Sequence, residues 1–132
     1  MKTIIAGCRW IGDYDVVCKA IEASEFEVTE VVSGAANGVD TLGENWATAH
    51  DIPIKRFPAQ WKNLKAPGAL IRKNRYGKYN AKAGFVRNAL MAKYADALIA
   101  IWDGKSRGTA NMIALANKHG LKVYIFLVEE QK

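Results

Sequence analysis

The sequence predicts an α/β protein, a three-layer Rossmann-like fold with a mainly parallel sheet of about five strands and helices on both faces. Two observations lead to this prediction. Segments with the pattern of strands alternate along the chain with segments that have the pattern of helices. The later strand segments are also apolar without alternation, as in parallel strands that are buried on both faces. The 132 residues show no internal repeat and no dividing linker, so we expect a single domain over residues 1–132.

The first half of the chain contains strand patterns that alternate with helix patterns. The expected strands are Thr3–Ala6, Phe26–Val32 and Ile54–Phe57. Between them, Asp15–Ala23 places apolar residues at helical spacing, and a second amphipathic helix is predicted from Val39 to Ala49.

The second half continues the alternation. A helix is predicted over Ala83–Tyr94, and the continuous apolar run Ala97–Trp102 predicts a buried strand. A further helix over Thr109–His119 is followed by Gly120, which fits the position just after a helix end. The last expected strand is Val123–Val128.

Positive charge is concentrated in one interval of the chain. The net charge is +6, and residues 52–95 contain eleven Lys and Arg but no Asp or Glu. Within this interval, residues from about 62 to 82 have no clear period and are interpreted as a basic insertion at one strand end. The interval favours a phosphate-bearing partner, and the alternative is a basic face that is merely solvated.

The composition excludes several classes of protein. Half of the residues are hydrophobic and 24% are charged, which is typical of soluble globular proteins. No apolar run approaches the ~18 residues of a membrane span, and we expect no secretion signal, so the expected location is cytoplasmic, without a membrane partner. Cys8 and Cys18 have neither zinc nor CxxC spacing, so we expect two reduced thiols, no metal and no cofactor. We also expect a homo-oligomer.

Three turns occupy the same place in the predicted topology, because each follows a strand and precedes a helix. They are "GCRWIGD" (Gly7–Asp13), "SGAANGVD" (Ser33–Asp40) and "DGKSRGT" (Asp103–Thr109). Open α/β sheets bind ligands at this carboxyl edge. Glycine lets backbone N–H groups approach an anion, and helix N-termini add partial positive charge. Phosphate is therefore the expected ligand. The expected ligand-binding residues are Gly7, Arg9, Trp10, Ser33, Gly34, Asn37, Gly38, Asp40, Gly104, Ser106, Arg107, Gly108 and Thr109.

Individual side chains in these turns have more than one interpretation. Arg9 and Arg107 suit phosphate oxygens, and Asp40 suits ribose hydroxyls. Asp40 and Thr109 equally suit a structural role, in which they satisfy free amides at a helix start. Trp10 either stacks on a base or packs at the sheet edge. Glycines in such turns are also often required for steric reasons alone.

The motifs, taken together, resemble a known family. The turn "SGAANGVD", followed by "FPAQW" (Phe57–Trp61), "AGFVRN" (Ala83–Asn88) and "IAIWDGKSRGT" (Ile99–Thr109), resembles the YspA-related branch of the SLOG superfamily. That superfamily is named for the DNA-processing Smf proteins and the Lonely-guy phosphoribohydrolases. The resemblance covers nearly the whole chain. It implies a Rossmann-like fold whose glycine turns hold a nucleotide or a nucleotide-derived ligand.

The sequence also departs from the patterns of these relatives. Lonely-guy hydrolases have a PGGxGTxxE motif whose final Glu works at the glycosidic bond, whereas "KSRGTANM" has Met112 at that position. A general acid/base is therefore missing there. The family's "SGGARGVD" has Gly and Arg where this chain has Ala35 and Asn37, so one phosphate-facing charge is lost.

These observations lead to two functional hypotheses. The first is a binding domain, or a weak hydrolase, for a phosphorylated nucleotide derivative such as a nucleoside monophosphate or ADP-ribose. If an N-glycosidic bond is cleaved, Arg87 and Asp103 are the expected catalytic residues. The alternative is a single-stranded nucleic-acid-binding module related to DNA-processing protein A, because the basic interval interleaves Trp61, Tyr76 and Tyr79 with cations.

Overall fold

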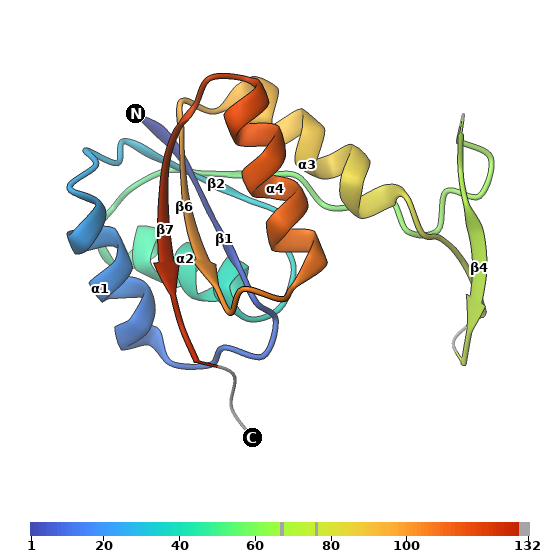
Figure 1. Ribbon diagram of the computed structural model, residues 1–132, viewed down its shortest axis with the longest axis horizontal. Helices are drawn as coiled ribbons and strands as arrows, with labels where there is room; N and C mark the ends of the chain where they lie inside the picture. Colours follow the sequence, from blue (N-terminus) through green and yellow to red (C-terminus); the bar gives the residue numbers. More distant parts are fainter. Residues whose placement is uncertain (67, 76, 130–132) are drawn as a thin grey trace.

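The main sheet is parallel and has the strand order β3-β2-β1-β6-β7 (Figure 1). A computed structural model describes residues 1–66, 68–75 and 77–129, and all statements below concern these residues. The predicted parallel sheet of about five strands is confirmed. Its strands are β1 (Lys2–Gly7), β2 (Glu30–Ser33), β3 (Ile54–Arg56), β6 (Ala97–Trp102) and β7 (Lys122–Leu127).

Helices cover both faces of this sheet, as the sequence predicts. Ile5 of β1 packs on the side of α1 and α2, while its neighbour Ile4 packs on the side of α3 and α4. Adjacent residues of a strand point to opposite faces, so the central strand contributes to two separate cores. The helices are α1 (Tyr14–Ser24), α2 (Val39–Ala49), α3 (Ala83–Tyr94) and α4 (Arg107–Lys118).

Local sequence signals explain where several elements begin and end. The β6 sequence ALIAIW is almost wholly buried because this strand pairs with β1 on one side and β7 on the other. At the start of α1, the Asp13 carboxylate accepts a hydrogen bond from the Asp15 amide (2.9 Å), which caps the helix. Gly120, with φ of +75°, follows the end of α4 as predicted.

Two predicted boundaries are wrong. The strand expected over Phe26–Val32 begins at Glu30, because Phe26 and Val28 pack their side chains against the core ahead of the residues that pair with β1. Helix α4 begins at Arg107, two residues before the predicted start at Thr109. Arg107 and Gly108 therefore belong to the first helical turn, where backbone N–H groups lack helical acceptors.

The basic insertion contains an antiparallel hairpin that the sequence does not predict. Its strands are β4 (Ile71–Asn74) and β5 (Gly77–Asn80), and the hairpin stands away from the three-layer body (Figure 1). Every residue of β4 is exposed, so the strand has no buried face and leaves no alternating pattern in the sequence.

A buried asparagine joins the hairpin to the body of the protein. Only 4% of Asn80 is exposed. Its Oδ1 accepts hydrogen bonds from the amides of Leu70 (3.3 Å) and Lys82 (3.0 Å), and its Nδ2 donates to the carbonyl of Asn63 (3.3 Å). The backbone N–H of Asn80 also donates to the carbonyl of Trp61 (2.6 Å). One side chain thus holds both ends of the insertion.

No helix within the described ranges combines the length and the apolar character needed to cross a membrane. The expected cytoplasmic location stays a prediction.

Replacing Asn80 with Leu is expected to release the hairpin without unfolding the three-layer body. The substitution removes three side-chain hydrogen bonds, each worth about 1 kcal/mol. Trypsin under native conditions should then cut within residues 62–82 at least about tenfold faster, with little change in the thermal unfolding midpoint. Asn63→Leu is the matched control, because its bond to Asn80 uses only the main-chain carbonyl. Equal cleavage of the two variants would contradict the role given to Asn80.

Candidate ligand-binding site

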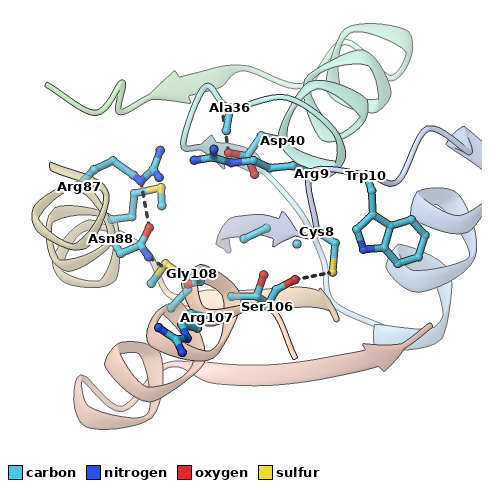
Figure 2. A pocket seen from close by; sticks show the side chains of 15 residues that line it. Cys8, Arg9, Trp10, Ala36, Asp40, Arg87, Asn88, Ser106, Arg107 and Gly108 are labelled. Carbon is cyan, nitrogen blue, oxygen red and sulfur yellow. Dashed lines mark hydrogen bonds between the residues drawn. The ribbon is translucent and has the colours of Figure 1, made fainter. Parts of the chain in front are cut away.

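A cavity of about 350 Å³ opens at the carboxyl edge of the sheet, beside the neighbouring strands β1 and β6 (Figure 2). The chain continues from β1 to β2 on one side of this point and from β6 to β7 on the other, so the strand order reverses here. Open α/β sheets bind ligands at such a switch point. The cavity is lined by Ala6, Gly7, Cys8, Arg9, Trp10, Ala36, Asp40, Arg87, Asn88, Met91, Ser106, Arg107, Gly108, Thr109 and Met112.

The structure brings many of the predicted residues together around this cavity. All three turns contribute to its wall or to the contacts just behind it. The predicted residues that line it are Gly7, Arg9, Trp10, Asp40, Arg87, Ser106, Arg107, Gly108 and Thr109.

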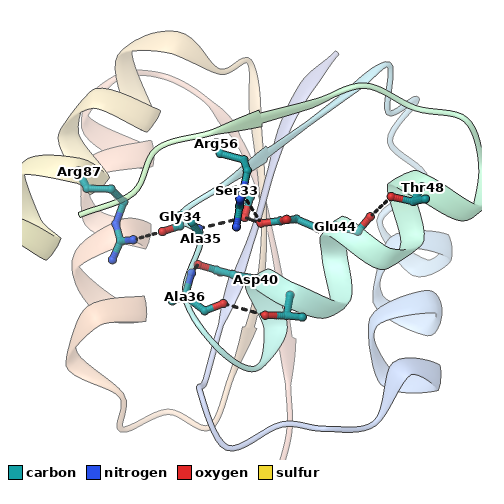
Figure 3. Close-up of polar contacts among 10 residues, drawn as sticks. Ser33, Gly34, Ala35, Ala36, Asp40, Glu44, Thr48, Arg56 and Arg87 are labelled. Atoms are coloured by element: carbon teal, nitrogen blue, oxygen red, sulfur yellow. Dashed lines mark hydrogen bonds and ion pairs between the residues drawn. The ribbon is translucent and has the colours of Figure 1, made fainter. Parts of the chain in front are cut away.

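Other predicted residues lie outside the cavity. Ser33 is buried and donates its hydroxyl hydrogen bond to Glu44 Oε2 (2.6 Å), which also pairs with Arg56 Nε at 3.3 Å (Figure 3). Asn37 is exposed to solvent, and a Cβ at Gly104 would meet no neighbouring atom. Five predicted ligand-binding residues do not line the cavity: Ser33, Gly34, Asn37, Gly38 and Gly104.

Gly38 and Gly34 are needed for close packing behind the cavity. Gly38 has φ of +76°, and a Cβ there would lie 2.5 Å from the carbonyl oxygen of Arg9. A Cβ at Gly34 would lie 2.6 Å from Arg87 Nη1 and 2.7 Å from Asp40 Oδ2. The absence of a side chain at Gly34 therefore lets Arg87 reach its carbonyl (Figure 3).

Asp40 is the buried carboxyl group of the site. It is 8% exposed, and its Oδ2 accepts a hydrogen bond from the Ala36 amide (3.2 Å). The N-cap of α2 is Gly38, so Asp40 is not the capping residue of that helix. Burial raises the pKa of Asp40 to about 6, although the Ala36 bond and the cations Arg87 and Arg9 favour its ionised form. A carboxyl group with this pKa can donate or accept a proton near neutral pH.

Arg87 links the turn after β2 to the first turn of α4. Its Nη1 donates to the carbonyl of Gly34, and its Nε donates to Asn88 Oδ1 (2.9 Å). Asn88 Nδ2 in turn donates to the carbonyl of Gly108 (3.2 Å) and to Asn111 Oδ1 (3.0 Å). Burial lowers the pKa of Arg87, while Asp40 opposes this change, and the guanidinium remains charged.

The start of α4 offers backbone donors to the cavity. Its N-cap residue, Ser106, makes no side-chain capping bond. Instead, the Ser106 hydroxyl donates to Asp103 Oδ2 (3.2 Å) or to Cys8 Sγ (3.3 Å). A Cβ at Gly108 would meet no atom within 4 Å, so the wall is open at this turn. Such a helix start is suited to an anion.

Asp103, one of the two predicted catalytic residues, does not line the cavity. Its carboxylate accepts hydrogen bonds from the amides of Ser106 and Lys105 (both 2.8 Å) and from Trp10 Nε1 (3.2 Å). These bonds hold the pKa of Asp103 well below its ordinary value, so the group stays ionised at neutral pH. Asp103 therefore positions the turn and the indole of Trp10, and it is poorly suited to donate a proton.

The departures from the family patterns have visible consequences. Met112 is buried and lines the cavity, so an apolar side chain occupies the place of the expected Glu. Ala35 has φ of +59°, a left-handed conformation that favours the glycine of the family pattern.

Sequence analysis missed five residues of the wall, namely Ala6, Cys8, Ala36, Asn88 and Met91. Burial raises the pKa of the Cys8 thiol, so this group stays protonated at neutral pH. Asn88 is buried on the same helix as Met91 and Ala92, and this polar residue on an apolar helical face was a usable signal. Cys8 and Met91 have the sequence context of ordinary core residues, and no local pattern distinguishes them as part of a site.

Replacing Asp40 with Asn is expected to change how stability depends on pH. The pKa of about 6 in the folded protein lies above the ordinary value of 3.8, so the folded state binds the proton more tightly. The free energy of unfolding of the native protein should therefore fall, relative to Asp40→Asn, by ~2–3 kcal/mol between about pH 4 and pH 7. Denaturant unfolding across this range measures the difference. Asp51→Asn, at an exposed position, controls for the loss of one charge. A stability difference that does not vary with pH would contradict the burial of a titrating carboxyl group.

Comparisons with known proteins agree with this architecture. The X-ray structure of DNA processing protein A (DprA) from Streptococcus pneumoniae matches 94% of this chain, with a TM-score of 0.65 and 20% sequence identity. The match covers 49% of that protein, so this chain spans about half its length. This structural similarity shows that the chain has the same Rossmann-like α/β fold. Comparison of the sequence with curated proteins gives no match.

The family comparison rests on the N-terminal half of the chain. The sequence model of the "YspA, cpYpsA-related SLOG family" matches residues 1–64, which include β1, β2 and the glycine turns that follow them. The resemblance that the motifs indicate is therefore confirmed for residues 1–64, which are similar to the YspA, cpYpsA-related SLOG family.

Proposed function

We propose that this protein binds a phosphorylated nucleotide, or a small molecule derived from one, in the cavity beside β1 and β6. The observation that carries the proposal is the meeting of Arg9, Arg87 and Arg107 with the uncapped start of α4 around one cavity. Cations and free N–H groups at a strand switch point are suited to phosphate. The similarity of residues 1–64 to a SLOG family supports the same ligand class.

In this proposal the two ends of the cavity have different tasks. The phosphate lies against the first turn of α4, where Gly108 leaves room and Arg107 supplies charge. The sugar lies towards Asp40, whose carboxylate accepts hydrogen bonds from hydroxyl groups. A phosphate beside Asp40 would be repelled once that group ionises, so the opposite orientation is disfavoured.

Any reaction is proposed to be slow. The apolar Met112 replaces a carboxylate, and Asp103 is already engaged by backbone amides. Asp40 replaces Asp103 in our proposal as the group that donates or accepts a proton, because it lines the cavity and its pKa is about 6. Arg87 keeps its proposed role and would stabilise negative charge beside Asp40.

A second candidate function is binding of single-stranded nucleic acid. The specific observation is the hairpin, whose strands carry the exposed cations Arg72, Lys73 and Lys78. Tyr76, which the sequence argument used, lies outside the described residues. The fold is also that of a protein named for DNA processing. Several phosphate contacts give a steep fall of affinity with salt, whereas one mononucleotide gives a shallow fall. Titrations at several salt concentrations distinguish the two functions.

The expected assembly of this chain into a homo-oligomer stays a prediction.

Gly108→Val is expected to weaken the binding of nucleoside monophosphates while the protein stays folded. A Cβ at this position meets no atom within 4 Å, and the valine side chain would enter the space proposed for phosphate. Affinity measured by calorimetry should fall at least about tenfold, as expected when a charged hydrogen bond is lost. Gly12→Val is the matched control, since a Cβ at Gly12 also meets no atom within 4 Å and Gly12 lies outside this cavity. Wild-type affinity in Gly108→Val would place the phosphate elsewhere.

The unmodified protein is expected to release little or no free base from nucleoside monophosphates. A positioned acid/base contributes about 10²–10⁴ in rate, and the carboxylate of the Lonely-guy pattern is absent at Met112. Chromatography of a nucleoside monophosphate panel measures the free base, with Met112→Glu and Asp40→Asn assayed in parallel. Robust turnover that is lost in Asp40→Asn would show that Asp40 has taken over the missing role and would contradict a slow reaction.

A further inference from the structure

A second hollow, of about 970 Å³, lies between the hairpin and α3. We call it the hairpin groove. Arg9 and Arg107 line both this groove and the cavity at the sheet edge, so the two spaces adjoin at these side chains. The residues that line the groove are Arg9, Trp61, Leu70, Arg72, Asn74, Tyr79, Ala81, Lys82, Phe85, Val86, Ala89 and Arg107.

Trp61 provides an aromatic surface in this groove. Its ring lies against the start of α3, where a Cβ at Gly84 would come within 3.0 Å of it. Tyr79 of β5 meets Trp61 edge to face, with ring centroids 6.5 Å apart. The guanidinium of Arg9 lies 5.9 Å from the centre of the Trp61 ring. Aromatic rings with a neighbouring guanidinium are suited to stack on a nucleobase.

The charge of the groove favours an anionic ligand. Arg9, Arg72, Lys82 and Arg107 line it, and none of the groove residues named above is acidic. Arg9 and Arg107 lie where the groove meets the cavity. In a ligand that occupies both spaces, a linking phosphate would therefore lie close to these two guanidinium groups.

We infer that the hairpin groove is a subsite for the second nucleoside unit of a dinucleotide. The inference rests on the proposed function, because the first nucleotide occupies the cavity. The linking phosphate lies between Arg9 and Arg107, and the second base stacks on Trp61. The groove volume is within the roughly 300–1,000 Å³ of small-molecule sites. A single-strand site commonly follows about 4–16 nucleotides, which is more than one such groove accommodates.

The test compares affinities for AMP and for the 5′-phosphorylated dinucleotide pApA. Calorimetry on the wild-type protein should show pApA binding about ten- to a hundredfold more tightly than AMP, as expected from one stacked base. In Trp61→Ala this ratio should fall to nearly one, whereas Trp61→Phe should keep most of it. Tyr79→Ala provides a second variant if Trp61→Ala does not fold. Lys73→Ala, on the hairpin but outside the groove lining, should keep the wild-type ratio.

The outcomes separate this inference from the function on which it rests. Failure of AMP to bind the wild-type protein contradicts the proposed function itself. Equal affinity for AMP and pApA, or an unchanged ratio in both Trp61→Ala and Tyr79→Ala, contradicts only the second subsite. A 20-nucleotide single strand that binds far more tightly than pApA, with a steep salt dependence, would overturn the dinucleotide in favour of nucleic acid.

Discussion

Arg87 connects parts of the site that are distant in the sequence. Its guanidinium donates to the Gly34 carbonyl in the turn after β2 and, through Asn88, reaches the Gly108 carbonyl in the first turn of α4. Those two turns follow strands on different sides of the switch point. The turn after β1 also contacts both of them, because the Val39 amide donates to the Cys8 carbonyl (3.4 Å) and the Ser106 hydroxyl donates to Cys8 Sγ (3.3 Å). The relative positions of the acidic and basic groups in the cavity therefore depend in part on where α3 packs.

The same arrangement explains how a carboxyl group can remain in the site. Removal of Asp40 from water disfavours its charged form, and the neighbouring cations Arg87 and Arg9 offset part of that cost. The result is a group that is neither permanently ionised nor permanently neutral near physiological pH. Asp103 shows the opposite case, because backbone amides stabilise its charge and remove it from proton transfer.

Those features of the fold that depend on local pattern could be predicted from the sequence. Buried strands such as Ala97–Trp102 are apolar throughout, and glycine turns between strands and helices mark the edge at which the cavity opens. The hairpin could not be predicted, because β4 is exposed throughout and has no buried face to impose a period. Cys8 and Met91 reach the cavity only through the packing of β1 and α3, and the pKa of Asp40 arises from burial in three dimensions.

The separate attachment of the hairpin has a consequence for how such proteins diverge. Its ladder is independent of the main sheet, and its ends are held by one buried residue, Asn80. Changes in its length or chemistry therefore leave the strand register and both cores intact, since longer surface connections cost little free energy. No hairpin residue that the structure describes lines the cavity, so a different insertion at this point would keep the cavity wall and change only the lining of the hairpin groove.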